Sequence, residues 1–249
     1  MGRWRADARD GQANSVKEPT QGRAVRTRQR IIIAAAEVVN ESTFDKAGLV
    51  DIAARAGVTT GAFYFYFDNK EDIAHAVIES QNAYSQRKAT KIVDEGHSLI
   101  ETLLRVSADF TYDILEDPLV RAGARLTSEV LALSRPPLQP FTEWVAFNTH
   151  LLDVGRNENV IDRDLNTHNA AEFIVGSFTG HYLLSTLLHD LAGLPRRILT
   201  MWELFLDAAA VTPDTWKERA HDLFLGRPAP QPLNIEQATE RHLATAHLL

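Results

Sequence analysis

Cysteine is absent from all 249 residues of the sequence. A chain without thiols forms no disulfide, offers no thiolate ligand to a metal and has no cysteine nucleophile. Proteins without disulfides are typical of a reducing compartment, so we expect this one to be cytoplasmic.

Long apolar runs are also missing from the sequence. No stretch approaches the ~20 apolar residues that span a bilayer, and the first residues lack the apolar segment of a secretion signal. We therefore expect no membrane partner. Strand-like alternation of apolar and polar residues does not persist over a useful length either, and the apolar spacing is helical instead. The expected fold class is all-α.

The chain also lacks an excess of positive charge, which would point directly to a nucleic-acid partner: its net charge is −7. The distribution of charge along the chain is more informative than the net charge. Residues 1–30 hold eight basic and three acidic side chains, residues 31–75 hold three and seven, and residues 76–249 hold fifteen and twenty-three. This polarity favours a basic end that faces DNA, and the N-terminal arm must supply much of the phosphate attraction.

Catalytic and metal-binding patterns are not found. The nine histidines are scattered and none forms a His-x-x-x-His pair with an intervening glutamate. Gly176-Ser177 lacks the rest of a nucleophile elbow, and no glycine-rich phosphate loop precedes a helix. We predict no catalytic residue, no metal and no cofactor. An enzyme would need a constellation that the chain does not show, whereas a helical interaction module would show no salt-dependent affinity for DNA.

Two short helices separated by a tight turn are predicted between Leu49 and Phe67. Apolar residues at helical spacing mark the first helix, and Gly57 suits the left-handed conformation in which helices often end. Thr59 is a favourable N-cap for the second helix, which begins with small residues and ends with the aromatic run Phe63–Phe67. This layout is typical of a helix-turn-helix, whose second helix enters the DNA major groove.

The remaining pattern is helical throughout. We expect a disordered basic arm over residues 1–24. It serves either as a solubilising tail or as a segment that extends along DNA. The DNA-binding domain is expected over 25–75, a second helical domain over 76–211 and a C-terminal extension over 212–249. The expected helices are Arg26–Asn40, Leu49–Ala56, Thr59–Phe65, Lys70–Ile92, Ser98–Leu115, Pro118–Leu133, Phe141–Glu158, His168–Asp190, Pro195–Ala210, Thr215–Leu225 and Ile235–Leu248.

The helix-turn-helix carries a longer motif, Ile-Ala-x-x-Ala-Gly-Val-Thr-x-Gly-x-x-Tyr-x-x-Phe-x-x-Lys, over residues 52–70. With Thr27-Arg28 upstream, it resembles the DNA-binding signature of the TetR family of bacterial regulators. The resemblance implies three helices for DNA and six for ligand binding and dimerisation. It also implies a homodimer on a double-stranded DNA operator, joined through the last two long helices of the second domain; Gly176-x-x-x-Gly180 lies on one of them, although packing within one subunit would also explain it.

By this resemblance we expect DNA to be contacted by residues of the second helix, its flanks and the first helix. They are Arg28, Thr59, Thr60, Gly61, Tyr64, Tyr66 and Lys70. Thr60 replaces a lysine that is common in the family, and Tyr66 replaces a histidine, so the operator sequence is expected to differ.

Trp144, together with the segment Asp117–Glu129, resembles a subgroup of the family, the γ-butyrolactone and furan autoregulator receptors of actinomycetes. An indole offers a flat apolar wall with one N–H donor, suited to a small amphiphilic ligand; packing between helices is the alternative. The expected ligand-binding residues are Trp144, Leu126, Thr127, Phe141, Phe147, Gln81, Asn82, Phe178 and Tyr182. The predicted function is a repressor released by such a signal, and the alternatives are another ligand, such as an antibiotic, or an orphan regulator or activator.

Overall fold

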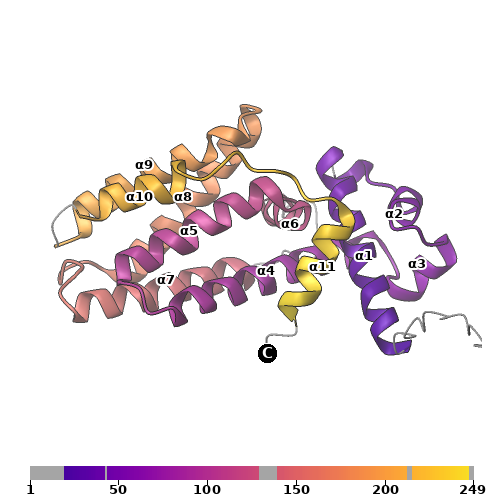
Figure 1. Cartoon of the computed structure of the whole chain (residues 1–249), viewed down its shortest axis with the longest axis horizontal. Coiled ribbons are helices and arrows are strands. Elements are labelled where there is room, and N and C mark those ends of the chain that lie inside the picture. Colours follow the sequence, from indigo (N-terminus) through magenta and orange to yellow (C-terminus); the bar gives the residue numbers. More distant parts are fainter. Residues whose placement is uncertain (1–19, 43, 129–138, 212–214, 247–249) are drawn as a thin grey trace, which may run out of the picture.

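The structure is a computed structural model that describes residues 20–42, 44–128, 139–211 and 215–246. Within these ranges the chain forms eleven α-helices (Figure 1). Their bounds are α1 Thr20–Glu41, α2 Leu49–Arg55, α3 Thr60–Tyr66, α4 Lys70–Asp94, α5 Leu99–Glu116, α6 Pro118–Ser128, α7 Gln139–Asn157, α8 Thr167–Leu187, α9 Leu194–Ala209, α10 Trp216–Leu225 and α11 Ile235–Ala246. The all-α prediction is confirmed.

Helices α1 to α3 form a small head at one end of the elongated molecule (Figure 1). Its core is built from the isoleucine and alanine run of α1 with Ile52 and Phe63, all buried. Gly57 has a φ of 65°, the left-handed turn expected between α2 and α3. The Thr59 hydroxyl accepts from the Ala62 N–H at 3.1 Å and caps α3 as predicted. Local turn chemistry thus sets the angle between the two short helices.

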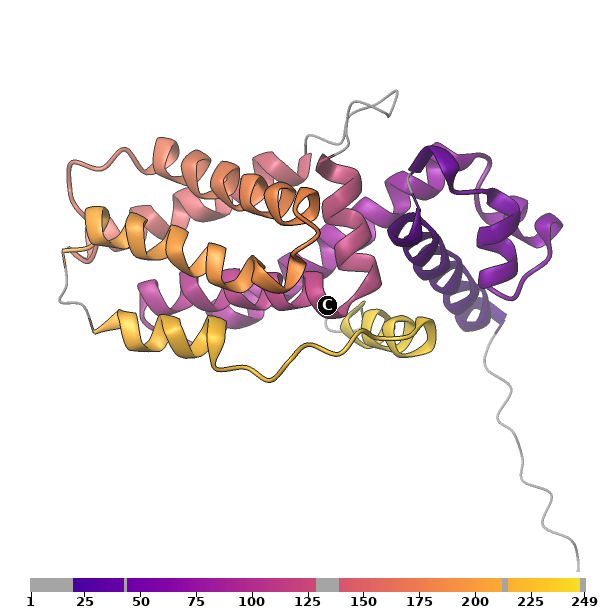
Figure 2. The same ribbon diagram turned by 90° about the horizontal axis from the view of Figure 1, so that it is seen from above.

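The second domain is a bundle in which α5 packs against α7, α9 and α10, and α8 packs against α7 and α9 (Figure 2). Its core centres on Leu103, Trp202 and Phe224, each almost fully buried. The long helix α4 leaves the head and continues into this bundle, so it belongs to both cores: Ile73 and Val77 pack in the head and Tyr84 packs in the bundle.

The C-terminal helix α11 returns to the head and lies along α1 (Figures 1 and 2). Ala238 is buried in the core of the head, and Glu240 pairs with Arg26 on α1. One turn after Ala238, His242 Nε2 lies 3.0 Å from Asp117 Oδ2, and both side chains are buried. The extension therefore bridges the two domains, a role that the sequence did not reveal.

Several helix bounds differ from those expected. α1 begins at Thr20 rather than near Arg26, and α11 packs along it. The rest of the predicted arm, residues 1–19, lies outside the described residues. The same is true of residues 129–133, the predicted end of α6. α8 ends at Leu187, short of Asp190, and His189 takes a φ of 53° in the turn that follows.

None of the helices among the described residues is long and apolar enough to cross a membrane. A search of the same residues for three or more His, Asp or Glu side chains placed to hold a metal ion found no such group.

Candidate DNA-contact surface and ligand cavity

Helix α3 presents its N-terminal residues to solvent. Thr60 and Gly61 are exposed, and no heavy atom beyond the neighbouring backbone lies within 4 Å of a Cβ built on Gly61. Another surface can therefore approach this backbone closely. Tyr64 is 50% exposed and Phe65 is 81% exposed, whereas Phe63 points into the head. The exposed face of α3 is thus available for a partner while its other face is fixed by the core.

The two cations predicted to contact phosphates differ in their surroundings. The Arg28 side chain is exposed, and its guanidinium carbon lies 5.2 Å from the centre of the Phe67 ring. The Lys70 ammonium instead donates to the Asp45 carbonyl at 2.8 Å and lies 4.7 Å from the centre of the Phe44 ring. Lys70 therefore holds the start of α4 against the 3-10 turn Phe44–Lys46 between α1 and α2. The Arg28 guanidinium, by contrast, is exposed and packs on an aromatic ring.

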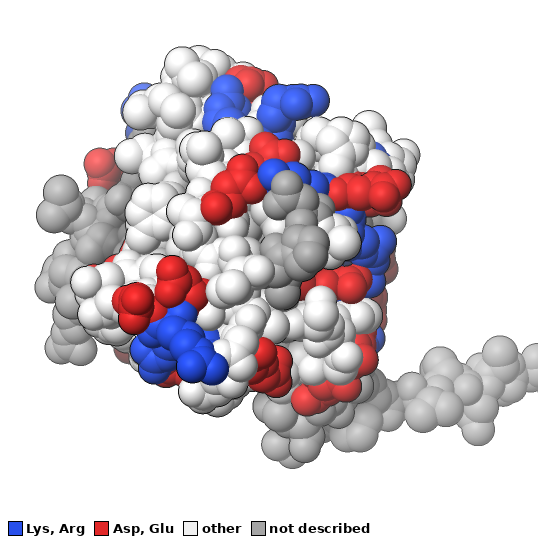
Figure 3. Space-filling model, turned by 90° about the vertical axis from the view of Figure 1, so that its left-hand side faces the viewer, with Lys and Arg blue, Asp and Glu red and all other residues white. Residues whose placement is uncertain are grey.

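Other charges near the head are paired within the chain. Arg55 bonds both carboxylate oxygens of Glu41 at 2.8 Å and approaches Glu37 at 3.2 Å. The hydrogen bonds from Arg55 lower the pKa of Glu41, and the same carboxylates raise the pKa of Arg55. At the opposite end of the molecule, acidic and basic side chains are mixed, with no continuous basic patch (Figure 3). A phosphate backbone would find no matching surface on that face.

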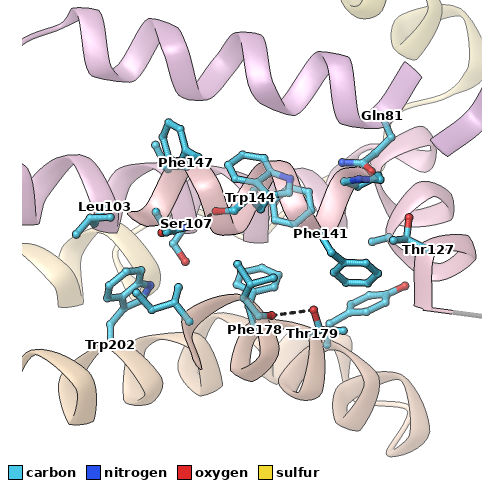
Figure 4. A pocket seen from close by; sticks show the side chains of 18 residues that line it. Gln81, Leu103, Ser107, Thr127, Phe141, Trp144, Phe147, Phe178, Thr179 and Trp202 are labelled. Carbon is cyan, nitrogen blue, oxygen red and sulfur yellow. Dashed lines mark hydrogen bonds between the residues drawn. The ribbon is translucent and has the colours of Figure 1, made fainter. Parts of the chain in front are cut away.

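A cavity of about 120 Å³ lies inside the second domain (Figure 4). Residues of α4, α5, α6, α7, α8 and α9 line it, and every one of them is uncharged. The Phe110 ring stacks on Trp144 with centroids 6.1 Å apart and lies 5.3 Å from Phe178. The Phe147 ring stands at 82° to Trp144. These rings form an apolar chamber suited to a neutral molecule with a hydrocarbon part.

Seven of the nine side chains predicted to bind a ligand line this cavity: Gln81, Thr127, Phe141, Trp144, Phe147, Phe178 and Tyr182. The other two predicted residues, Leu126 and Asn82, do not line this cavity. Leu126 is buried in the core of the head, because one residue along a helix turns the side chain by about 100° away from Thr127. Asn82 donates to Glu143 Oε2 at 2.6 Å and does not line the cavity.

Further cavity residues were missed by the sequence analysis. Ser107 and Phe110 on α5 and Trp202 on α9 line the chamber. The apolar spacing predicted helices for these segments, but a helix buried on several sides gives no signal for which side faces a cavity. The tryptophan in the middle of α9 was the one available sign, and a tryptophan there is also expected from ordinary core packing.

Close packing of α6 on α4 forms one end of the chamber. A Cβ on Gly123 would lie 2.5 Å from the Cβ of Gln81, so only glycine allows this approach. Thr127 sits one turn later on α6, and its hydroxyl donates to the Gly123 carbonyl at 2.7 Å. Gln81 and Thr127 thus lie near each other at the α4–α6 end of the cavity (Figure 4).

The opposite side of α6 packs on the head. Leu119, Ala122 and Leu126 are buried in the core of the head, and Arg125 Nη1 donates to the Val39 carbonyl at 2.8 Å. Asn40 Nδ2 donates to the Pro118 carbonyl at 2.9 Å. One short helix therefore contacts the cavity on one side and the C-terminal end of α1 on the other.

An apolar strip of α8 and α9 is left uncovered by the described chain. Leu183, Leu187 and Leu204 are exposed, and Leu187 is 68% exposed. Gly176 and Gly180 lie on the same helix, and a Cβ on either would meet no atom within 4 Å. The two glycines are therefore not needed for packing within one subunit. Leu183 and Leu187 lie one turn apart on α8, so these exposed apolar side chains share a face of that helix.

Two family models match the chain. The model described as "Bacterial regulatory proteins, tetR family" matches residues 31–77, which hold most of the head. The model described as "Tetracyclin repressor-like, C-terminal domain" matches residues 97–211, the greater part of the bundle around the cavity.

Similar proteins agree with these matches. The A-factor receptor protein of Streptomyces griseus is 31% identical over 190 residues, 76% of this chain and 66% of that relative, just under two thirds of its length. A solved structure of a gamma-butyrolactone receptor (ArpA like protein) is 30% identical, with a TM-score of 0.66, covering 89% of this chain and 99% of that one.

A structure of the TetR family protein CprB from Streptomyces coelicolor, in complex with its biological operator sequence, is 34% identical. Its TM-score is 0.69, and the match covers 82% of this chain and 98% of that one. Similarity of this extent, spread over both the head and the bundle, does not arise from the helix-turn-helix alone. The chain belongs to the TetR family of bacterial transcriptional regulators.

Proposed function

We propose that this protein is a homodimeric, DNA-binding transcriptional repressor that leaves its operator when a small signalling molecule enters the cavity. The observation that carries the proposal is the position of α6. Thr127 on α6 lines the chamber, and Arg125 on α6 donates a hydrogen bond to α1, which supports the DNA-contact surface. A ligand can shift the DNA affinity only if it favours one placement of this helix over another.

The chemistry of the cavity favours a neutral amphiphile of the γ-butyrolactone or furan type. Its described lining holds neither a carboxylate for a cationic drug nor a cation for an anionic ligand. The relatives named receptors of A-factor and of gamma-butyrolactone support the same class. In keeping with that likeness, we propose that the regulated genes serve secondary metabolism or antibiotic production.

Ligand entry would widen the chamber. A volume of about 120 Å³ is well below the roughly 300–1,000 Å³ of typical small-molecule sites. The lining helices therefore have to move apart, and α4 and α6 lead directly into the head. Displacing them changes the position of α3, and coupling of about 1–3 kcal/mol is enough for release.

The exposed strip on α8 and α9 is the proposed dimer interface. Pairing two copies through it would place two heads on successive major grooves, about 34–36 Å apart on a near-palindromic site. Thr59, Thr60, Gly61 and Tyr64 would then contact bases or the nearby backbone, while Arg28, Tyr66 and Lys70 would contact phosphates.

A gel-shift titration with the DNA upstream of the protein's own coding region tests the proposal. The titration is repeated with γ-butyrolactone and furan signals added. A shift that one of these signals releases supports both the repressor function and the ligand class. A shift that none of these signals releases would support DNA binding but reject this ligand class. The titration would then be repeated with a panel of antibiotics. Absence of any salt-dependent shift, on this DNA or in a selection from random sequences, would reject the proposal.

A further inference from the structure

The indole N–H of Trp202 stands apart from the other polar groups of the chamber. Trp202 is 1% exposed, and its Nε1 is buried without a hydrogen-bond partner among the described residues. A buried donor left unsatisfied destabilises the protein by roughly 1–3 kcal/mol. The nitrogen lies on the side of the ring that faces the other cavity residues (Figure 4). A native core tolerates such a group most readily where something else binds to it.

The threonine hydroxyls of the lining, in contrast, have already used their protons. Thr127 donates to the Gly123 carbonyl at 2.7 Å, and Thr179 donates to the Val175 carbonyl at 2.8 Å. A hydroxyl has one proton to donate, so both groups can only accept from a ligand. The lining therefore holds acceptors on α6 and α8 and, on α9, a buried donor without a partner among the described residues.

Donor and acceptors lie apart in the chamber. Figure 4 shows Trp202 at the end that also holds Leu103 and Ser107, with Thr127 and Gln81 at the other end. The rings of Trp144 and Phe178 lie between these ends. An elongated molecule would thus have its apolar part between the rings and reach the indole N–H at one end.

We propose that Trp202 is a specificity-determining residue, whose indole N–H donates to an oxygen acceptor, a ketone or hydroxyl oxygen, carried on the apolar part of the ligand. This inference rests on the proposed function only in taking the cavity as the ligand site. It adds that ligands which differ by a single oxygen are distinguished at α9. A site built to hydrogen-bond an oxygen rejects the analogue that lacks it, because the donor is then left unpaired.

The test is a two-by-two binding experiment on the full-length protein. One probe pair is a γ-butyrolactone with a ketone in its side chain and the analogue in which that C=O is replaced by C=CH₂. A second pair is a medium-chain dialkyl ketone and its methylene isostere. Affinities are measured by calorimetry, without DNA, for the wild type and for Trp202→Phe. We expect the wild type to prefer the ketone about tenfold and the variant to show almost no preference.

Trp144→Phe is the matched control, because it alters the other indole of the chamber. It should weaken both members of a pair by the same factor and leave the preference for the ketone intact. An equal ketone preference in the wild type and Trp202→Phe would overturn the inference. A Trp202-dependent preference for the simple ketone, with no lactone bound, would uphold the inference and reject the proposed ligand class. Failure of the wild type to bind any probe would reject both.

Replacing a buried indole by a phenyl ring leaves a void, so a measurement on the wild type accompanies the variant. The chain has four tryptophans, and their indole N–H resonances are assigned by elimination with Trp4→Phe, Trp144→Phe and Trp216→Phe. The ketone should move the Trp202 resonance downfield, as expected when an N–H gains an acceptor, and the methylene isostere should not. Equal shifts with both probes would contradict the proposal.

Discussion

Arg28 and Lys70 carry the same charge, but their surroundings predict different roles in DNA binding. Arg28 is exposed, whereas the Lys70 ammonium is bonded to the Asp45 carbonyl. If Arg28 contacts a phosphate, Arg28→Ala should weaken operator binding uniformly across DNA sequences and reduce the slope of log affinity against log salt by about 1.

Lys70→Ala should change that slope less and lower the thermal midpoint of the head instead. Both predictions are tested by operator-binding titrations at several salt concentrations and by thermal unfolding curves of the two variants. A larger loss of slope for Lys70→Ala would show that its phosphate contact dominates.

His181 on α8 links stability to pH. Burial, together with the nearby positive charge of Arg197, lowers the pKa of His181 below its ordinary 6.5. The unfolded chain therefore binds more protons than the folded chain between the lowered pKa and 6.5, so stability falls as the pH drops through this window.

We expect His181→Gln to flatten the decline of the thermal midpoint below pH 6.5. His221→Gln, on the exposed side of α10, is the control and should leave the decline in place. Identical pH profiles for the wild type and His181→Gln would contradict the assignment.

At the scale of an element, α6 is the connection between cavity and head. Arg125 on α6 donates to the Val39 carbonyl at the end of α1, and a hydrogen bond from a charged group contributes about 1.5–3 kcal/mol. Arg125→Ala should leave ligand binding close to that of the wild type but reduce by about tenfold the ligand-induced loss of DNA affinity.

The measurement is operator affinity with and without saturating ligand. Arg105→Ala, which removes a guanidinium paired with Glu101 away from the head, provides the comparison. Equal ligand responses in both variants would show that α6 transmits its effect by another contact.

Helix α11 contacts both domains, and two alanines on it, one buried and one exposed, allow its packing on the head to be tested. Ala238 is buried in the core of the head, whereas Ala244 is exposed on the same helix. Ala238→Arg should destabilise the protein by about 1–3 kcal/mol, because the added side chain overpacks a filled site.

Chemical denaturation and hydrogen exchange in α1 and α11 test this expectation. Ala244→Arg should change neither. Matching stabilities for the two variants would mean that α11 does not hold the head.

At the scale of the whole molecule, we propose that two copies dimerise through the exposed strip of α8 and α9. Leu187→Glu puts a charge into this strip, and an unpaired charge at an apolar interface is strongly unfavourable. We expect the variant to be monomeric by light scattering and to lose at least tenfold in operator affinity.

Val93→Glu replaces another exposed apolar residue, at the end of α4, and should remain like the wild type. A dimeric Leu187→Glu protein would exclude this face as the interface.

Sequence alone determined what depends on neighbours in the chain. Apolar spacing predicted the helices, and Gly57 with Thr59 predicted the turn that positions α3, because cap and turn preferences are local. The aromatic wall around Trp144 could also be predicted, through the resemblance to receptors that share the segment. Contacts between segments far apart in the chain could not be predicted, as the packing of α11 along α1 shows.

Tertiary structure decided which side of each helix faces the cavity. Thr127 lines the chamber and Leu126 enters the core of the head, although both lie on the same turn of α6. The helix pattern marks both as inward, and only the packing of two cores against α6 separates them. Trp202 comes from a helix far along the chain, and His242 meets Asp117 across 125 residues. No local preference encodes contacts of that range, because they exist only once the helices have packed.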